Sequence, residues 1–376
     1  MGAASSDQER IDLFNLYVGE KRPQNDLAES DIGHFTVTLM PDYEQRIKQL
    51  HKSPQKHTQI EIRDGKLTEK VSFSEERPGK WEITAIASFS KDASHQSILL
   101  DDPINDNGLW DLCEILTFIT GRRVTTEDRL ERYSYKKHGE PACIGIETLR
   151  TASLAWKNRN NLRNEDITYA LFAYNEALNQ NDLHTMAALY TCALNIICDN
   201  VRSDIGQIPK KCRNQLSKKI ESIIDKEKAL TDSQREAYKA LIKARVMQGP
   251  FSALDNLRSL LQELDVIPSS PSQDDVLQRV KFINVVRNRI IHTGKMPTLP
   301  NLTREQSARY TVSIIGGVIP EICRMFIGKK LGFAERGLGS LSLYTDDLKN
   351  FFEAGQWRGW NLKLQSFEDW FYGESL

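Results

Sequence analysis

The chain has 376 residues, 40% hydrophobic and 27% charged, and its formal net charge of −1 excludes a protein that binds nucleic acid through overall positive charge. The length predicts two domains, and any surface for a polyanion must come from a local cluster of basic residues. The longest apolar run, 312–322, is too short to span a bilayer and contains Pro320 and Glu321, so we expect a cytoplasmic protein without a membrane segment.

Alternating apolar residues predict a mostly antiparallel β-sheet near the start of the chain. Residues 1–32 are polar and are expected to form a tail or an edge segment. The turn pair Asp64-Gly65 separates two alternating runs, which predicts a β-hairpin. The sheet is expected to end near 98–100, and its alternating runs are 34–40, 59–63, 70–74 and 81–89.

A helix is predicted over 109–119 and should stop at Gly121. The charged stretch that follows, 122–129, is interpreted as a solvated connector, with a ligand contact as the alternative. Polar, turn-rich residues come next and mark a domain boundary. We therefore predict a β-rich regulatory or sensing domain over 1–142 and an all-α domain over 143–376, which makes the fold class α+β.

Apolar residues at helical spacing predict helices through most of the second domain. The predicted helices are 167–179, 183–201, 232–247, 251–264, one that begins at 272, and one over 303–331 that Gly316-Gly317 and Pro320 interrupt. Elsewhere in this domain, Lys210, Lys211 and Arg213 form a basic cluster with no acidic residue before Glu221. The cluster is a candidate contact for an RNA backbone, and a solvated helix face is the alternative.

The six cysteines form no Cys-x-x-Cys pair, and the histidines show no His-x-x-x-His spacing. The carboxylates lack the Asp-x-Asp pattern of a metal-dependent nuclease. We therefore expect a reducing compartment, no disulfide framework, no metal site and no cofactor.

Six aromatic residues lie close together near the C-terminus: Phe351, Phe352, Trp357, Trp360, Trp370 and Phe371. Stacking on nucleic-acid bases is one use of such a cluster. We favour a tail that packs onto the body or buries a subunit interface.

One polar constellation interrupts the apolar face of the helix expected to begin at 272. Asn288 and His292 lie one turn apart, and Arg287 lies about 140° from His292, so the three share less than half of the circumference. An arginine binds phosphate bidentately, a histidine moves protons near neutral pH, and an asparagine holds an oxygen without adding charge. The arrangement predicts a phosphate-handling site.

The stretch 287–292 resembles the Arg-Asn-x-x-x-His signature of HEPN domains, helical domains of many prokaryotic RNases, toxins and anti-phage proteins. The resemblance covers about the last half of the chain and implies a metal-independent endoribonuclease that cleaves RNA, tRNA being one candidate, by 2′-hydroxyl attack. It implies His292 as general acid and base, and Arg287 as the residue that neutralises the phosphorane. Asn288 would position His292 or hold the phosphate. Arg289, which the signature leaves free, is a candidate RNA-binding neighbour.

In this family two subunits complete the site, so the resemblance also implies a homodimer or a higher even-numbered oligomer. A sensor joined to such a nuclease is typical of bacterial abortive-infection defence, with a phage-derived trigger that acts through the N-terminal domain. The main alternative is a catalytically inactive HEPN-like protein that binds nucleic acid, a nucleotide or a partner protein. Another alternative is an ordinary core helix whose polar end carries a solvated arginine and histidine. A coincidental motif predicts that His292 is buried and far from any second copy.

Overall fold

The computed structural model describes residues 8–19, 29–51, 56–63, 66–73, 81–90, 108–133, 148–164, 167–180, 182–201, 210–227, 229–248, 253–268, 274–294, 313–333, 339–357 and 360–361. The strands are β1 (Gln8–Phe14), β2 (Glu29–Ile32), β3 (Phe35–Leu39), β4 (Lys56–Arg63), β5 (Lys66–Phe73), β6 (Ile83–Ser90), β7 (Gln356–Trp357) and β8 (Trp360–Asn361). The helices up to the middle of the chain are α1 (Tyr43–His51), α2 (Leu109–Thr120), the 3-10 helix η1 (Glu127–Arg132), α3 (Thr148–Asn158), α4 (Asn160–Asn164), α5 (Thr168–Asn179) and α6 (Leu183–Asn200). The later ones are α7 (Lys210–Lys226), α8 (Asp232–Gln248), α9 (Ala253–Glu263), α10 (Asp274–Thr293), the π-helix η2 (Ile314–Val318), α12 (Ile319–Lys330) and α13 (Gly339–Ala354).

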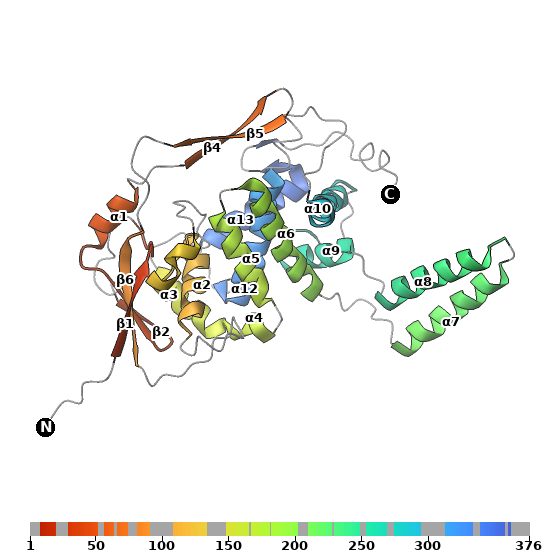
Figure 1. Cartoon of the computed structure of the whole chain (residues 1–376), viewed down its shortest axis with the longest axis horizontal. Helices are drawn as coiled ribbons and strands as arrows, with labels where there is room; N and C mark the ends of the chain where they lie inside the picture. The colour runs from red at the N-terminus through yellow and green to blue at the C-terminus, as the bar shows by residue number, and fades with distance from the viewer. Residues whose placement is uncertain are drawn as a thin grey trace.

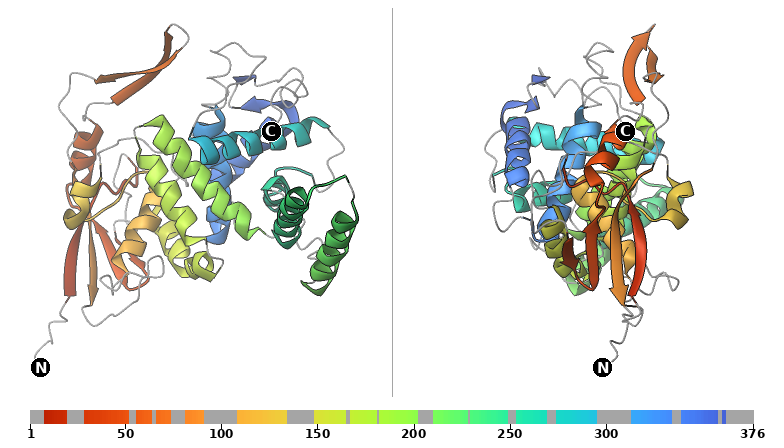
Figure 2. Two further views of the ribbon diagram at one scale, coloured as in Figure 1. Left: turned by 45° about the vertical axis from the view of Figure 1, so that its right-hand side comes forward. Right: turned by 90° about the vertical axis from the view of Figure 1, so that its left-hand side faces the viewer.

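The molecule is elongated, with a sheet at one end, a body of packed helices in the middle and the hairpin of α7 and α8 at the other end (Figure 1). The left view of Figure 2, turned by 45°, keeps this order. The α+β fold class predicted from the sequence is confirmed. Among the described residues, no helix is long and apolar enough to cross a membrane.

The sheet has the order β1-β6-β3-β2, and every neighbouring pair is antiparallel. Because β1 and β2 lie at its two edges, the prediction of an edge segment before residue 33 is confirmed. Alternation in β3 buries Phe35, Val37 and Leu39 on one face. The hairpin predicted from its turn pair is also confirmed, since β4 pairs with β5 from Lys56 opposite Phe73 to Arg63 opposite Lys66. The expected end of the sheet near 98–100 lies outside the described residues.

Helix α3 joins the sheet to the helical body. The Trp156 ring meets Phe35 edge-on, with 5.5 Å between ring centroids. Gly33 makes this contact possible, because its φ is +67° and a Cβ there would lie 2.0 Å from Nε1 of Trp156. One hydrophobic cluster therefore includes buried residues of both sheet and helices. The predicted boundary at 142 lies outside the described residues; α2, which precedes it, packs against α3 and α5.

The predicted helices 167–179, 183–201, 232–247 and 251–264 and the helix expected to begin at 272 are confirmed to within a few residues. The helix predicted over 303–331 is confirmed from 314 onward, and its start lies outside the described residues. In the last of them, the π-helix η2 contains Gly316 and Gly317, and Pro320 stands at the start of α12, so the predicted interruption is present. Of the C-terminal aromatics, Phe351 and Phe352 are buried against the body, as the packing interpretation expected. The structure does not describe Trp370 and Phe371.

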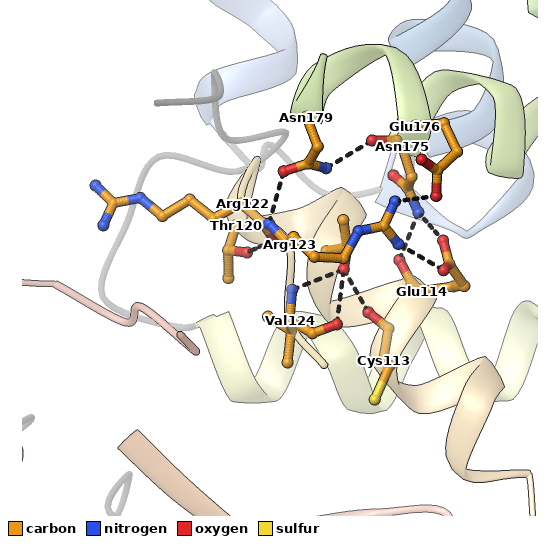
Figure 3. Close-up of polar contacts among 10 residues, drawn as sticks. Cys113, Glu114, Thr120, Arg122, Arg123, Val124, Asn175, Glu176 and Asn179 are labelled. Atoms are coloured by element: carbon orange, nitrogen blue, oxygen red, sulfur yellow. Dashed lines mark hydrogen bonds and ion pairs between the residues drawn. The ribbon is translucent and has the colours of Figure 1, made fainter. Parts of the chain in front are cut away.

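The connector after α2 differs from expectation, because Arg123 is 1% exposed rather than solvated. Its guanidinium donates to Glu114 Oε1 at 2.7 Å and to Glu176 Oε1 at 2.6 Å (Figure 3). Asn175 Nδ2 donates to the other oxygen of Glu114 at 2.6 Å. Burial lowers the pKa of Arg123, but the two carboxylates raise it by more, so the group stays charged. The interpretation as a solvated connector is wrong for this residue.

The backbone of Arg123, like its side chain, is held by hydrogen bonds. The Arg123 N–H donates to Asn179 Oδ1 at 3.0 Å, and Asn15 Nδ2 donates to the Arg123 carbonyl at 3.1 Å. Phe14 and Thr125 form an isolated antiparallel bridge. The connector therefore ties the end of β1 to α2 and α5 at one point.

We expect Arg123→Met to lower the free energy of unfolding by about 3–5 kcal/mol, because it leaves the buried Glu114 carboxylate without its counter-ion. Urea unfolding followed by circular dichroism measures this. Adding Glu114→Gln should recover part of the loss. Arg129→Met is the control, since its guanidinium lies over the Trp110 ring and its loss should cost about 1 kcal/mol or less. Equal losses for Arg123→Met and Arg129→Met would contradict the role given to Arg123.

Candidate active site at the end of helix α10

The motif lies on the last two turns of α10, as the sequence predicted. Val280, Ile283 and Val286 are buried along the inner face of this helix. Gly294 ends it, with φ +63° and an N–H that donates to the Ile290 carbonyl at 2.9 Å. The apolar period and the glycine stop therefore fix where the motif side chains can point.

Asn288 and His292 lie on the outer face of α10. His292 is exposed and Asn288 is half-buried. Val285, seven positions before His292 and so within about 20° of it around the helix, is 39% exposed. A histidine on this face can reach a substrate. Its exposure is opposite to the burial expected of a coincidental motif, and it is also what a solvated helix end predicts.

Arg287 points the other way, into the protein, and is 5% exposed. Its guanidinium donates to Asn284 Oδ1 at 3.2 Å, to the Ala253 carbonyl at 3.4 Å, and to Asn195 Oδ1 on α6. The side chain thus connects α10 to α6 and to the first residue of α9. In a single chain, the structure brings Asn288 and His292 together and separates Arg287 from them.

The charge of Arg287 distinguishes it from the other buried arginines among the described residues. Arg123 pairs with Glu114, Arg279 lies 3.8 Å from Asp275, and Arg324 pairs with Glu321. Arg287 faces two side-chain amides and a backbone carbonyl, with no carboxylate oxygen within 4.0 Å in the described protein. Amide oxygens orient a guanidinium without cancelling its charge, so a buried positive charge is kept available near the end of α10.

Sequence reasoning missed Asn195 and Asn284. Asn284 lies one turn before Arg287 and could have been found from helical spacing. Asn195 lies 92 positions away and carries no local signal. Of the candidate RNA contacts, Arg289 is half-buried on α10, and Lys210, Lys211 and Arg213 lie at the start of α7, where the structure does not describe their side chains.

The surroundings of Arg287 do not supply a cysteine nucleophile. Burial raises the pKa of Cys198 to about 12, although the charge of Arg287 opposes this shift. The thiol is therefore protonated at neutral pH. Among the described residues, no three His, Cys, Asp or Glu side chains gather in a way that could hold a metal ion.

Comparison of the chain with protein-family models, with curated proteins and with solved structures finds no match. The function is therefore argued from the chemistry of this site.

We expect Asn195→Asp to raise the free energy of unfolding by about 1 kcal/mol and Asn195→Ala to lower it by about 1–3 kcal/mol. The carboxylate gives Arg287 a charged partner in the same place, whereas alanine leaves a buried donor without an acceptor. Thermal and urea unfolding measure both. Gln215→Glu, an exposed change from amide to carboxylate on α7, is the control and should stay within about 0.5 kcal/mol. A loss of stability in Asn195→Asp would show that the charge of Arg287 is already balanced.

Proposed function

We propose that this protein is a metal-independent endoribonuclease of the HEPN type that cleaves RNA, with tRNA among its candidate substrates. The observation that supports it is an exposed His292 beside Asn288, on a helix whose buried Arg287 has no carboxylate partner among the described residues. These are a proton carrier, a polar group for an oxygen and a charge for a phosphorane.

RNA can be cut without metal because its own 2′-hydroxyl is the nucleophile. The bond from O2′ to phosphorus forms as the bond from phosphorus to O5′ breaks. His292 of one copy takes the proton of the 2′-hydroxyl, and His292 of a second copy gives a proton to O5′. The products are a 2′,3′-cyclic phosphate and a 5′-hydroxyl, and Asn288 holds the phosphate or orients the imidazole.

The burial of Arg287 defines how it contributes in this proposal. In the described chain it anchors α10 to α6 and α9 and acts on the phosphorane through its field. Five helical residues rise about 7.5 Å, and unit charges about 10 Å apart interact by about 1.7 kcal/mol at an effective dielectric constant near 20. That is about a tenfold effect on rate, so Arg287 supports the reaction while His292 carries the larger part.

One copy of α10 offers one exposed histidine, so two copies are needed for the two proton transfers. Val285 is 39% exposed and Ile291 is 42% exposed, and they place apolar surface around Asn288 and His292. In this proposal two α10 helices meet there across a two-fold axis, which makes the active species a homodimer or a higher even-numbered oligomer. The N-terminal sheet then serves as the sensor of a phage-derived trigger in abortive-infection defence.

A second candidate function is a catalytically inactive HEPN-like protein that binds nucleic acid, a nucleotide or a partner protein. The orientation of Arg287 favours it, because within one chain this side chain shares no face with His292. The two candidates differ in whether removal of the His292 imidazole changes any chemistry.

We expect wild-type protein to cut total cellular RNA or tRNA in EDTA and to leave 2′,3′-cyclic phosphate ends. His292→Ala should slow cutting by about 10²–10⁴-fold, the usual contribution of a general acid or base. His184→Ala is the matched control, because His184 is also an exposed histidine, with 69% of its side chain accessible on α6, and should leave the rate unchanged. Folded wild-type protein that binds RNA without cutting it would support the binding protein instead, provided that RNA also stays uncut in host cells with and without phage infection.

Val285→Glu should separate the copies, because it places two carboxylates on the face proposed to pair. We expect light scattering to show a monomer with an unchanged circular dichroism spectrum and an RNA cleavage rate that falls at least tenfold. Ile223→Glu on α7, which also charges an exposed apolar residue, is the control and should keep the oligomer. A wild-type monomer that cuts RNA would disprove the paired site.

A further inference from the structure

The hairpin of α7 and α8 concentrates positive charge. Residues 210–248 contain eleven Lys and Arg and five Asp and Glu, a net charge of +6. The remaining residues contain 39 basic and 46 acidic side chains, a net charge of −7. The overall charge of −1 therefore hides two parts of opposite sign.

The charge is also divided along the hairpin. All five acidic residues lie within 221–236, around the connection between the two helices, whereas 210–220 and 237–248 together contain eight basic residues and no acidic one. Because α7 and α8 pack side by side and antiparallel, these two acid-free stretches belong to the same end of the hairpin, away from the connection (Figures 1 and 2). The two stretches are well separated in the sequence, so the fold creates the basic end.

Three of the five acidic residues, all near the connection, form ion pairs within the hairpin. Asp225 binds Lys239 Nζ at 2.5 Å, and Glu236 binds the same amine at 3.0 Å. Asp232 binds Arg235 at 2.6 Å. Lys218 and Lys219, in the acid-free part of α7, are exposed. At least these two positive charges of the basic end therefore face water.

The hairpin is an arm rather than part of the core. Among the described elements, the extensive packing of α7 and α8 is with each other. Ile223 is 68% exposed and Tyr238 is 49% exposed, so apolar surface accompanies the charge. Four residues separate the end of α8 from Ala253, whose carbonyl accepts from Arg287. A ligand held by the arm is thereby tethered close to α10.

We propose that the α7–α8 hairpin is an RNA-binding arm, whose basic end contacts the phosphate backbone of a structured RNA and delivers it to α10. Eleven helical residues extend about 16 Å, a length over which a nucleic-acid duplex presents several phosphates. Exposed tyrosine adds a surface on which bases stack. The proposed ribonuclease is the premise for what this RNA is used for, but the binding itself does not require cleavage.

The test measures binding of a fluorescent stem-loop RNA with 2′-O-methyl riboses, which lacks the nucleophile and cannot be cut by 2′-hydroxyl attack. We expect Lys218→Glu/Lys219→Glu to raise Kd at least tenfold. The slope of log affinity against log salt should fall by about 2, because two phosphate contacts are removed. Lys157→Glu/Lys226→Glu is the control with the same change of charge on exposed lysines outside the acid-free stretches, and it should change Kd less than threefold.

The outcomes separate the arm from the ribonuclease. An unchanged Kd in Lys218→Glu/Lys219→Glu, or an equal change in the control, overturns the arm even if the wild type cuts ordinary RNA. Loss of binding in that variant alone supports the arm even if the wild type cuts nothing. Binding of the wild type to phosphatidylserine vesicles but not to the stem-loop RNA would also overturn it, since the partner would then be a membrane surface.

Discussion

The buried charge cluster around Arg123 is the constraint on which the rest of the arrangement depends. The Arg123 guanidinium has almost no access to water and is stabilised by the carboxylates of Glu114 and Glu176, which come from two different helices. The same residue's backbone binds Asn179 and Asn15, so the edge of the sheet is held at the same point. Displacing any one element would leave a buried charge or a buried polar group without a partner.

Packing between helices connects the Arg123 cluster to the candidate site. Helix α5, which carries Glu176, packs along α6, and α6 carries Asn195, the acceptor for Arg287. The two buried arginines thus have different roles. Arg123 is paired with two carboxylates and fixes geometry, whereas Arg287 is oriented by amides, with no carboxylate oxygen within 4.0 Å among the described residues. The proposed chemistry uses the positive charge of Arg287.

In the proposed site, the exposed His292 acts at the surface and the buried Arg287 acts from the interior. The histidine is available to a substrate and to a second copy, while the arginine fixes the helix that presents it. The sheet and the α7–α8 arm lie at opposite ends of the molecule, with the candidate site between them (Figure 1). This layout is compatible with separate places for a trigger and for an RNA.

The sequence by itself determined the elements whose signals are local. Alternation located β3, β4, β5 and β6, Asp64-Gly65 the hairpin, and the apolar period with Gly294 the motif helix, because each depends on residues within a few positions of one another. It did not locate β1 and β2, which lie in the polar stretch before residue 33. Only the tertiary structure decided that Arg123 is buried, that Arg287 binds Asn195, and that the two acid-free stretches of the arm share one end. Each of these joins residues dozens of positions apart, and charge patterns along a chain do not show whether a charged side chain will meet water or a distant partner.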